Sequence, residues 1–149
     1  MNSRNHIMFG SVGAWFYSHL AGMELTADFI VIRPRMVSES NKHLLLKLDC
    51  QLSTLHGLVH IAYTRDEHEL VPNSIRLRLS IPPNAQARAI FEPLFPGARC
   101  VKLTEGNKLI WSISQVSIAN ESIIENDLST GLMILHIGSG LYEYQVYWE

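Results

Sequence analysis

The residues able to bind a metal or move a proton are scattered through this sequence, and one short stretch gathers several of them. Residues 65–69 read Arg-Asp-Glu-His-Glu, which brings three carboxylates and an imidazole together. Zinc sites need such ligands at set spacings on a rigid element, and the His-Glu-x-x-His pattern of a helical zinc site does not occur. We therefore interpret residues 65–69 as a solvated loop, and we expect no bound metal and no cofactor.

The other candidate catalytic residues show no catalytic spacing. His43, His56, His60 and His136 stand singly, which is typical of surface or hydrogen-bonded core histidines. The sequence contains neither a Gly-x-Ser-x-Gly turn nor a glycine-rich phosphate loop. Acid–base catalysis on sugars needs two carboxylates that face one cleft, and most acidic residues here fall between the apolar runs. We therefore expect no catalytic residues that are sufficient by themselves.

Aromatic residues gather near the C-terminus, where Tyr142, Tyr144, Tyr147 and Trp148 share one short segment, with Trp111 upstream. Exposed rings at this spacing can stack on a sugar. Aromatic residues on a strand more often form the core of a sandwich and its cross-strand pairs. We interpret these residues as core, and a free-standing carbohydrate-binding module remains the alternative function.

The composition indicates one packed domain and excludes several classes of protein. The chain has 149 residues, of which 47% are hydrophobic and 17% charged, as expected for one packed domain. Its net charge of −2 provides no basic surface for a nucleic acid or an anionic membrane, and no apolar run is long enough to span a bilayer. Met1–Asn5 is polar and does not resemble a secretory signal. Cys50 and Cys100 favour two buried free thiols over a disulfide, which leaves the cellular compartment open.

After Gly22 the sequence has the pattern of short β-strands. Ile75, Leu77, Leu79 and Ile81 alternate with polar residues, which predicts a strand with one buried and one wet face. We predict a mainly β fold, an antiparallel β-sandwich of jelly-roll type preceded by one N-terminal α-helix. The strands are expected at residues 29–33, 43–52, 58–64, 74–81, 87–91, 99–103, 109–113, 116–118, 132–137 and 142–147. The polar stretch 120–130 is expected to be a connection.

The helix is predicted from residues 6–20, with Gly22 placed to end it. Two sets of apolar residues recur on it: Met8, Val12, Trp15, Phe16 and Leu20 on one face, and Ile7, Phe9, Ala14, Tyr17 and Ala21 beyond that face. A helix that is apolar nearly all round is normally buried on more than one side. We expect Met8, Val12, Trp15 and Phe16 to dock on the sandwich, and the other face to be free for a partner or for self-association.

Four motifs occur in a fixed order along the chain. They are Ser3-x-Asn5-His6 leading into Gly10-Ser11-Val12-Gly13-x-Trp15-x-Tyr17-x-x-Leu20-Ala21-Gly22, then Phe29-Ile30-Val31-Ile32-Arg33-Pro34, then Ile81-Pro82-Pro83-Asn84, and finally Gly138-Ser139-Gly140-Leu141-Tyr142. In this order they resemble the C-terminal region of the bacterial and fungal α-L-rhamnosidases. In that family the first motif enters and forms the last helix of an (α/α)6 catalytic barrel, and the others belong to the β-sandwich beside it.

The resemblance implies that residues 1–22 are the last helix of a catalytic barrel and that residues 23–149 are the C-terminal β-sandwich domain. The family releases terminal α-L-rhamnose with inversion, using one carboxylic acid and one carboxylate base. Both groups lie upstream of the matched region. The resemblance therefore implies a fragment or a truncated gene product that supports the barrel, its partner, and is inactive alone.

His6 matches the family histidine that hydrogen-bonds the rhamnose, a role that suits the one donor and one acceptor of a neutral imidazole. It is the candidate substrate-binding residue of the chain. Rhamnosides or other carbohydrates are the ligands that the resemblance implies.

Overall fold

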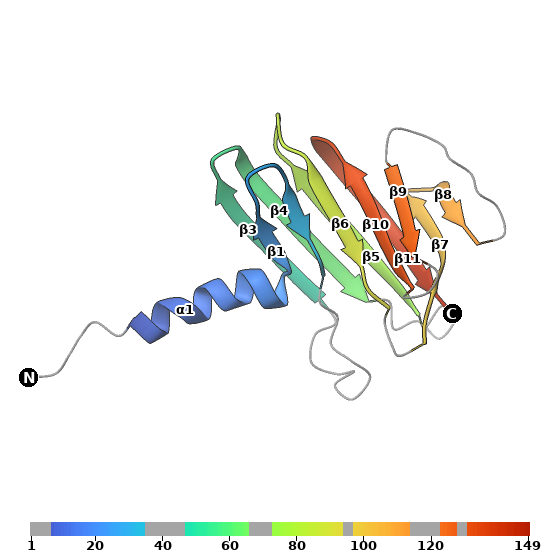
Figure 1. Cartoon of the computed structure of the whole chain (residues 1–149), viewed down its shortest axis with the longest axis horizontal. Helices are drawn as coiled ribbons and strands as arrows, with labels where there is room; N and C mark the ends of the chain where they lie inside the picture. The colour runs from blue at the N-terminus through green and yellow to red at the C-terminus, as the bar shows by residue number, and fades with distance from the viewer. Residues whose placement is uncertain (1–6, 35–46, 66–72, 94–96, 114–122, 128–130) are drawn as a thin grey trace, which may run out of the picture.

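The computed structural model describes residues 7–34, 47–65, 73–93, 97–113, 123–127 and 131–149. Two β-sheets form a sandwich, and one helical segment at the N-terminal end projects from it (Figure 1). The predicted class, mainly β with an N-terminal helix, is confirmed. Within the described residues, no helix has the length and the apolar character needed to cross a membrane.

The larger sheet has six strands, and all its neighbouring strands are antiparallel. In spatial order the strands are β3 (Lys47–Thr54), β4 (Gly57–Arg65), β5 (Ser74–Ile81), β11 (Gly140–Trp148), β7 (Cys100–Glu105) and β8 (Lys108–Ser112). The hairpin predicted between the second and third apolar runs is confirmed, because β3 and β4 pair from Lys47 opposite Thr64 to Thr54 opposite Gly57.

The smaller sheet has five strands and departs from the prediction in three respects. In spatial order the strands are β1 (Met23–Leu25), β2 (Ile30–Ile32), β6 (Ala87–Phe91), β10 (Leu132–Ile137) and β9 (Ile123–Asp127). Strands β2 and β6 are parallel, since the chain crosses to the other sheet and returns between them. Strand β9 lies inside residues 120–130, so the expectation of a plain connection there was wrong, and β1 was not predicted. The strand expected at 116–118 lies outside the described residues.

The core lies between the two sheets, as the alternation in the sequence predicts. Ile75, Leu77, Leu79 and Ile81 of β5 are all buried, while Arg76 and Arg78 on the same strand are exposed. One buried cluster joins these side chains to those of the smaller sheet. Burial of this continuous apolar layer is the dominant favourable contribution to the stability of the sandwich.

The helical segment consists of α1 (Ile7–Trp15) and one π-helical turn, η1 (Phe16–Leu20). The Ala21 amide donates to the Phe16 carbonyl over 2.9 Å, which closes the last turn. Gly22 follows with φ +68°, and a Cβ atom at this position would lie 1.7 Å from the Arg33 carbonyl oxygen. Only glycine accepts both constraints, so the predicted helix stop is confirmed.

The expected docking of the helix on the sandwich was wrong. Val12, Trp15 and Phe16 are each about half exposed (48%, 49% and 49%), and the side chain of Met8 lies outside the described part of the chain. Figure 1 shows α1 extending away from the two sheets. Only Ala21 and Gly22 lie between the helical segment and β1, which begins at Met23, so the link is too short to fold the helix back across a sheet.

Candidate functional site

The projecting helix, defined here as residues 7–20, is the most unusual surface of the molecule. Every residue from Ser11 to His19 is exposed, including the Trp15 and Tyr17 side chains. The Trp15 ring stacks on the His19 imidazole with 5.9 Å between ring centroids, a contact within the helix itself. An isolated helix of this length is marginal in water, and an exposed surface with so many large apolar side chains is a candidate docking surface.

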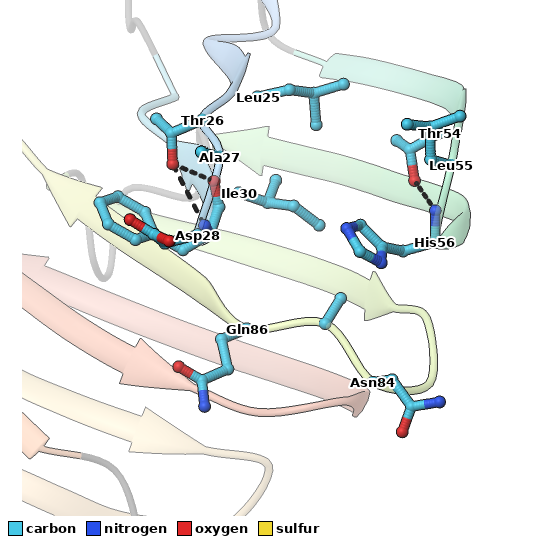
Figure 2. Close-up of a pocket in the computed structure, with 12 residues that line it drawn as sticks. Leu25, Thr26, Ala27, Asp28, Ile30, Thr54, Leu55, His56, Asn84 and Gln86 are labelled. Carbon is cyan, nitrogen blue, oxygen red and sulfur yellow. Dashed lines mark hydrogen bonds between the residues drawn. The ribbon is translucent and has the colours of Figure 1, made fainter.

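A small pocket lies at one end of the sandwich, between the loop after β1 and the turn between β3 and β4 (Figure 2). Its volume is about 160 Å³, and its walls include Leu25, Ile30, Leu55 and Ala85. The His56 imidazole points into this space, and its backbone amide donates to the Thr54 hydroxyl. The pocket accepts one large apolar side chain or a group of similar size.

The other polar residues that border this pocket do not converge on its centre. Asn84 and Gln86 flank Ala85 and extend away from His56 in Figure 2. Asn84 has φ +60°, the left-handed conformation that asparagine tolerates better than most residues, and it follows Pro82-Pro83 in the turn. Asp28 also lines the pocket, but Figure 2 shows its carboxylate on the opposite side from the His56 imidazole, so the two side chains do not form an acid–base pair.

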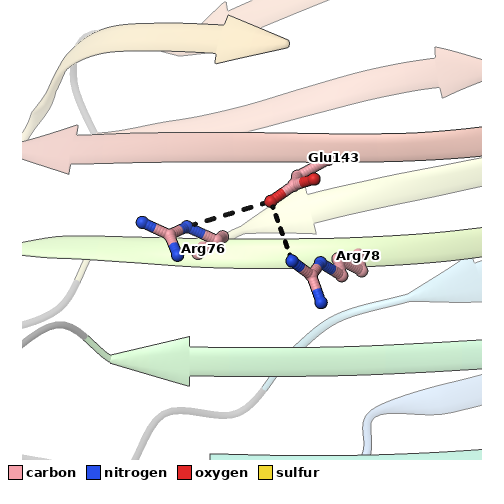
Figure 3. Close-up of polar contacts among 3 residues, drawn as sticks. All are labelled: Arg76, Arg78 and Glu143. Atoms are coloured by element: carbon pink, nitrogen blue, oxygen red, sulfur yellow. Dashed lines mark hydrogen bonds and ion pairs between the residues drawn. The ribbon is translucent and has the colours of Figure 1, made fainter. Parts of the chain in front are cut away.

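The outer face of the six-stranded sheet carries exposed ion pairs. Figure 3 shows Glu143 of β11 beside Arg76 and Arg78 of β5, with its Oε1 atom 3.9 Å from Arg76 Nε and 3.4 Å from Arg78 Nη2. On the neighbouring strands, His60 Nε2 lies 2.8 Å from Asp49 Oδ1. Exposed pairs of this kind contribute little to stability.

The aromatic residues near the C-terminus belong mainly to the core. Trp111, Tyr144 and Trp148 are buried, while Tyr142 and Tyr147 are partly buried. The Tyr142 ring stacks on Tyr144 with 5.7 Å between centroids, and its hydroxyl donates to the Gly138 carbonyl over 3.2 Å. These contacts support the core interpretation and leave no row of exposed rings among these five residues.

Both cysteines are free thiols, as expected. Cys100 is buried against Met133 and Cys50 is half-buried on strand β3, so the expectation of two buried thiols holds for Cys100 only. Burial raises the pKa of Cys100 to about 12. Burial and the neighbouring Asp49 carboxylate raise the pKa of Cys50 as well. Neither thiol has the lowered pKa of a catalytic nucleophile.

His136 is partly buried on β10, and other sequence predictions concern residues outside the described part of the chain. His6 and residues 66–69 lie outside the described ranges. Among the residues that are described, no group of three or more histidine, cysteine, aspartate or glutamate side chains is arranged to hold a metal ion. Sequence reasoning missed the pocket around His56, because its walls come from three segments far apart in the chain, and no local pattern marks them.

The fold and these surfaces define a β-sandwich module with a projecting helix. No protein-family model matches the chain. An α-L-rhamnosidase of Streptomyces avermitilis is 34% identical over 90 residues, which cover 58% of this chain and 8% of that protein. The structure of an α-L-rhamnosidase from Dictyoglumus thermophilum matches 99% of this chain, with a TM-score of 0.71 and 29% identity. The Streptomyces avermitilis α-L-rhamnosidase complexed with L-rhamnose has the same fold over 97% of the chain, with a TM-score of 0.60 and 24% identity.

The chain is therefore homologous to one part of the α-L-rhamnosidases, and the predicted resemblance to this family is confirmed. It spans 8% of the length of the matched relative and 14% of the Dictyoglumus thermophilum chain. It corresponds to a β-rich domain that makes up a small part of those larger enzymes.

Proposed function

We propose that this chain acts as the C-terminal accessory β-sandwich of an α-L-rhamnosidase. In this proposal residues 1–22 are the last helix of the catalytic barrel, and residues 23–149 form the sandwich that braces it. The observation that carries the proposal is the projecting helix, whose apolar side chains are exposed from Val12 to Tyr17. Homology to a small part of these enzymes supports a neighbouring domain as the body that covers it.

The energetics of the helix agree with such a partner. Full burial of one large apolar side chain stabilises a protein by about 1.5–3 kcal/mol, so covering the exposed half of Val12, Trp15 or Phe16 contributes on the order of 1 kcal/mol each. Three such residues are enough to offset the ordering of a helix that is marginal by itself. Gly13 has no atom within 4 Å of its Cβ position, which leaves room for close approach of a neighbouring helix.

The proposal assigns no catalysis to the chain alone. The acid and base of the family lie in the catalytic domain, and His6 contributes at most one contact to the rhamnose subsite. Purified protein should hydrolyse an aryl α-L-rhamnoside no faster than the uncatalysed reaction. Turnover that disappears in a single point variant of this chain would overturn this assignment.

A chimaeric enzyme tests the supporting role. Residues 1–149 replace the matching segment of the Dictyoglumus thermophilum enzyme, and hydrolysis of an aryl α-L-rhamnoside is measured before and after heating. We expect activity in the chimaera, a loss of at least tenfold after Trp15→Glu, and little change after Leu141→Glu, since Leu141 is 82% exposed on the sandwich. An unchanged Trp15→Glu chimaera, or equal activity when the segment is deleted, would contradict the proposal.

The alternative function, a free-standing carbohydrate-binding module, has less support because Tyr144 and Trp148 are buried. Calorimetric titration separates the two functions. The proposed accessory domain should bind rhamnose more weakly than about 1 mM, which corresponds to roughly −4 kcal/mol. A micromolar dissociation constant would favour the binding module.

A further inference from the structure

The two sheets of the sandwich end unevenly on the side where the helix leaves it. Strand β3, at the edge of the larger sheet, has eight residues and is about 27 Å long, while β1, at the edge of the smaller sheet, has three residues. The inward side chains of β3 therefore have too little sheet opposite them. We call Leu48, Cys50 and Leu52 of β3, together with Leu25 of β1, the open edge.

The inward side chains of β3 are less well covered than those of β8, the strand at the opposite edge of the same sheet. Leu48, Cys50 and Leu52 are each only partly buried, although they pack against the core cluster. At the opposite edge of the same sheet, Ile110 and Trp111 of β8 are buried. On β8 the described partly buried apolar residue is Leu109 alone, whereas on β3 all three inward residues are partly buried, so the edge beside the helix is the less covered of the two.

The open edge lies next to the base of the projecting helix. Tyr63 pairs with Leu48 in the β3–β4 ladder, and the Tyr63 hydroxyl reaches the Leu20 carbonyl over 3.5 Å. Tyr63 therefore links the last residue of the helical segment to the first inward residue of β3. From there the edge runs along β3 toward the pocket that Leu25, Leu55 and His56 line (Figures 1 and 2).

We infer that the domain that covers the projecting helix also packs on the open edge, with apolar side chains against Leu25, Leu48, Cys50 and Leu52. The inference rests on the proposed function and names a second surface for the same partner. A helix with its side chains is about 10–12 Å wide, so a domain that surrounds residues 11–19 extends sideways over the adjoining edge. The partner is the catalytic domain of an α-L-rhamnosidase, since the matched enzyme is much longer than this chain.

A second copy of this chain is a less suitable occupant. Lys47 and Asp49 alternate with the inward residues of β3 and are exposed, and charges on an edge strand discourage pairing with another strand. The apolar side chains face inward instead, so the contact is made by side chains that enter between the sheets.

Thiol labelling read by peptide mass spectrometry tests the inference at three positions in one sample. Cys50 reports on the open edge, buried Cys100 reports on unfolding, and a Val12→Cys variant reports on the helix. The isolated chain and the chimaera described above are treated with a maleimide at mildly alkaline pH, because the pKa of Cys50 is raised. We expect Cys50 and Val12→Cys to react in the isolated chain, and both rates to fall at least tenfold in the chimaera, with Cys100 unreactive throughout.

The outcomes separate the inference from the proposed function. Protection of Val12→Cys with Cys50 still reactive in the chimaera would overturn the open-edge contact and leave the proposed function standing. Reactivity of both positions in a folded chimaera would overturn both. An unreactive Cys50 in the isolated chain, or reactivity that falls as its concentration rises, would overturn the inference in favour of coverage by the chain itself or by a second copy.

A pair of exposed leucines provides a matched control. Leu25, on the open edge, is 50% exposed and Leu141 is 82% exposed, so a charge at either position leaves the isolated sandwich folded. In the chimaera, Leu25→Glu should increase the labelling rate of Cys50 at least threefold, and Leu141→Glu should leave it unchanged. Equal effects of the two substitutions would count against a contact at this edge.

Discussion

Replacing Gly22 with alanine tests how the projecting helix is joined to the sandwich. Gly22 has φ +68°, and its carbonyl accepts a hydrogen bond from the Arg33 amide over 2.8 Å. A Cβ atom would lie 1.7 Å from the Arg33 oxygen and 2.4 Å from its carbonyl carbon. These are backbone atoms that cannot rotate aside, so the two segments must separate.

The expected cost follows from two contributions. An L-residue in the left-handed region costs about 1–2 kcal/mol. Separation of the segments also removes the Arg33–Gly22 hydrogen bond, which contributes about 0.5–1.5 kcal/mol net. Separation of the two segments also weakens the start of the β1–β2 pair. We therefore expect Gly22→Ala to lower the free energy of unfolding by about 2–4 kcal/mol, measured by equilibrium unfolding in urea.

Gly106→Ala is the matched control. Gly106 has φ +54° in the turn between β7 and β8, and no atom lies within 4 Å of its Cβ position. It should therefore show the conformational cost alone, about 1–2 kcal/mol. If Gly22→Ala destabilises the protein no more than Gly106→Ala does, the close approach of Gly22 and Arg33 is not what holds the joint.

Three further predictions concern the sandwich and its helix. Deleting residues 1–20 should change the free energy of unfolding by less than about 1 kcal/mol, because most of the helix is exposed. Light scattering should show less self-association of the shortened protein. A large loss of stability would mean that the helix docks on the sheets. The free energy of unfolding should fall between pH 9 and 12, since burial raises the pKa of Cys100 from 9.0 to about 12 and that of Tyr63 from 10.0 to about 12, so both groups lose their protons first in the unfolded chain. In a pH series of urea titrations, Cys100→Ala should reduce the part of this fall that begins near pH 9, and an unchanged slope there would refute the assignment to Cys100. Leu77→Ala should lower the free energy of unfolding by about 2–5 kcal/mol in the same urea titration, because Leu77 is fully buried. Leu141→Ala should lower it by less than about 0.5 kcal/mol, and equal losses would refute the placement of Leu77 in the core.

The features that the sequence predicted correctly are local ones. Alternation from Ser74 to Ile81 indicates a strand with one buried face because side chains on a strand point to opposite sides in turn. Gly22 indicates the end of the helix because a left-handed residue is needed there. The four motifs in order were sufficient to indicate homology to the α-L-rhamnosidases.

Other elements could not be read from local patterns. Strand β1 has three residues, and β9 lies within a polar stretch where Glu125, Asn126 and Asp127 obscure the alternation. The residues of β9 have a low propensity for strands, and β9 forms because its backbone pairs with β10. The parallel pair of β2 and β6 depends on a crossing through the other sheet, which no window of sequence contains.

The order of the amino acids establishes that the helix is apolar nearly all round and that β3 has an apolar face. Which of these surfaces the chain covers depends on how its elements pack together in space. Periodicity sets the direction of each side chain relative to its own backbone, whereas burial depends on what lies opposite in space. Val12, Trp15 and Phe16 are therefore exposed although their spacing predicts a buried face, and Leu48, Cys50 and Leu52 are only half covered because β1 is short.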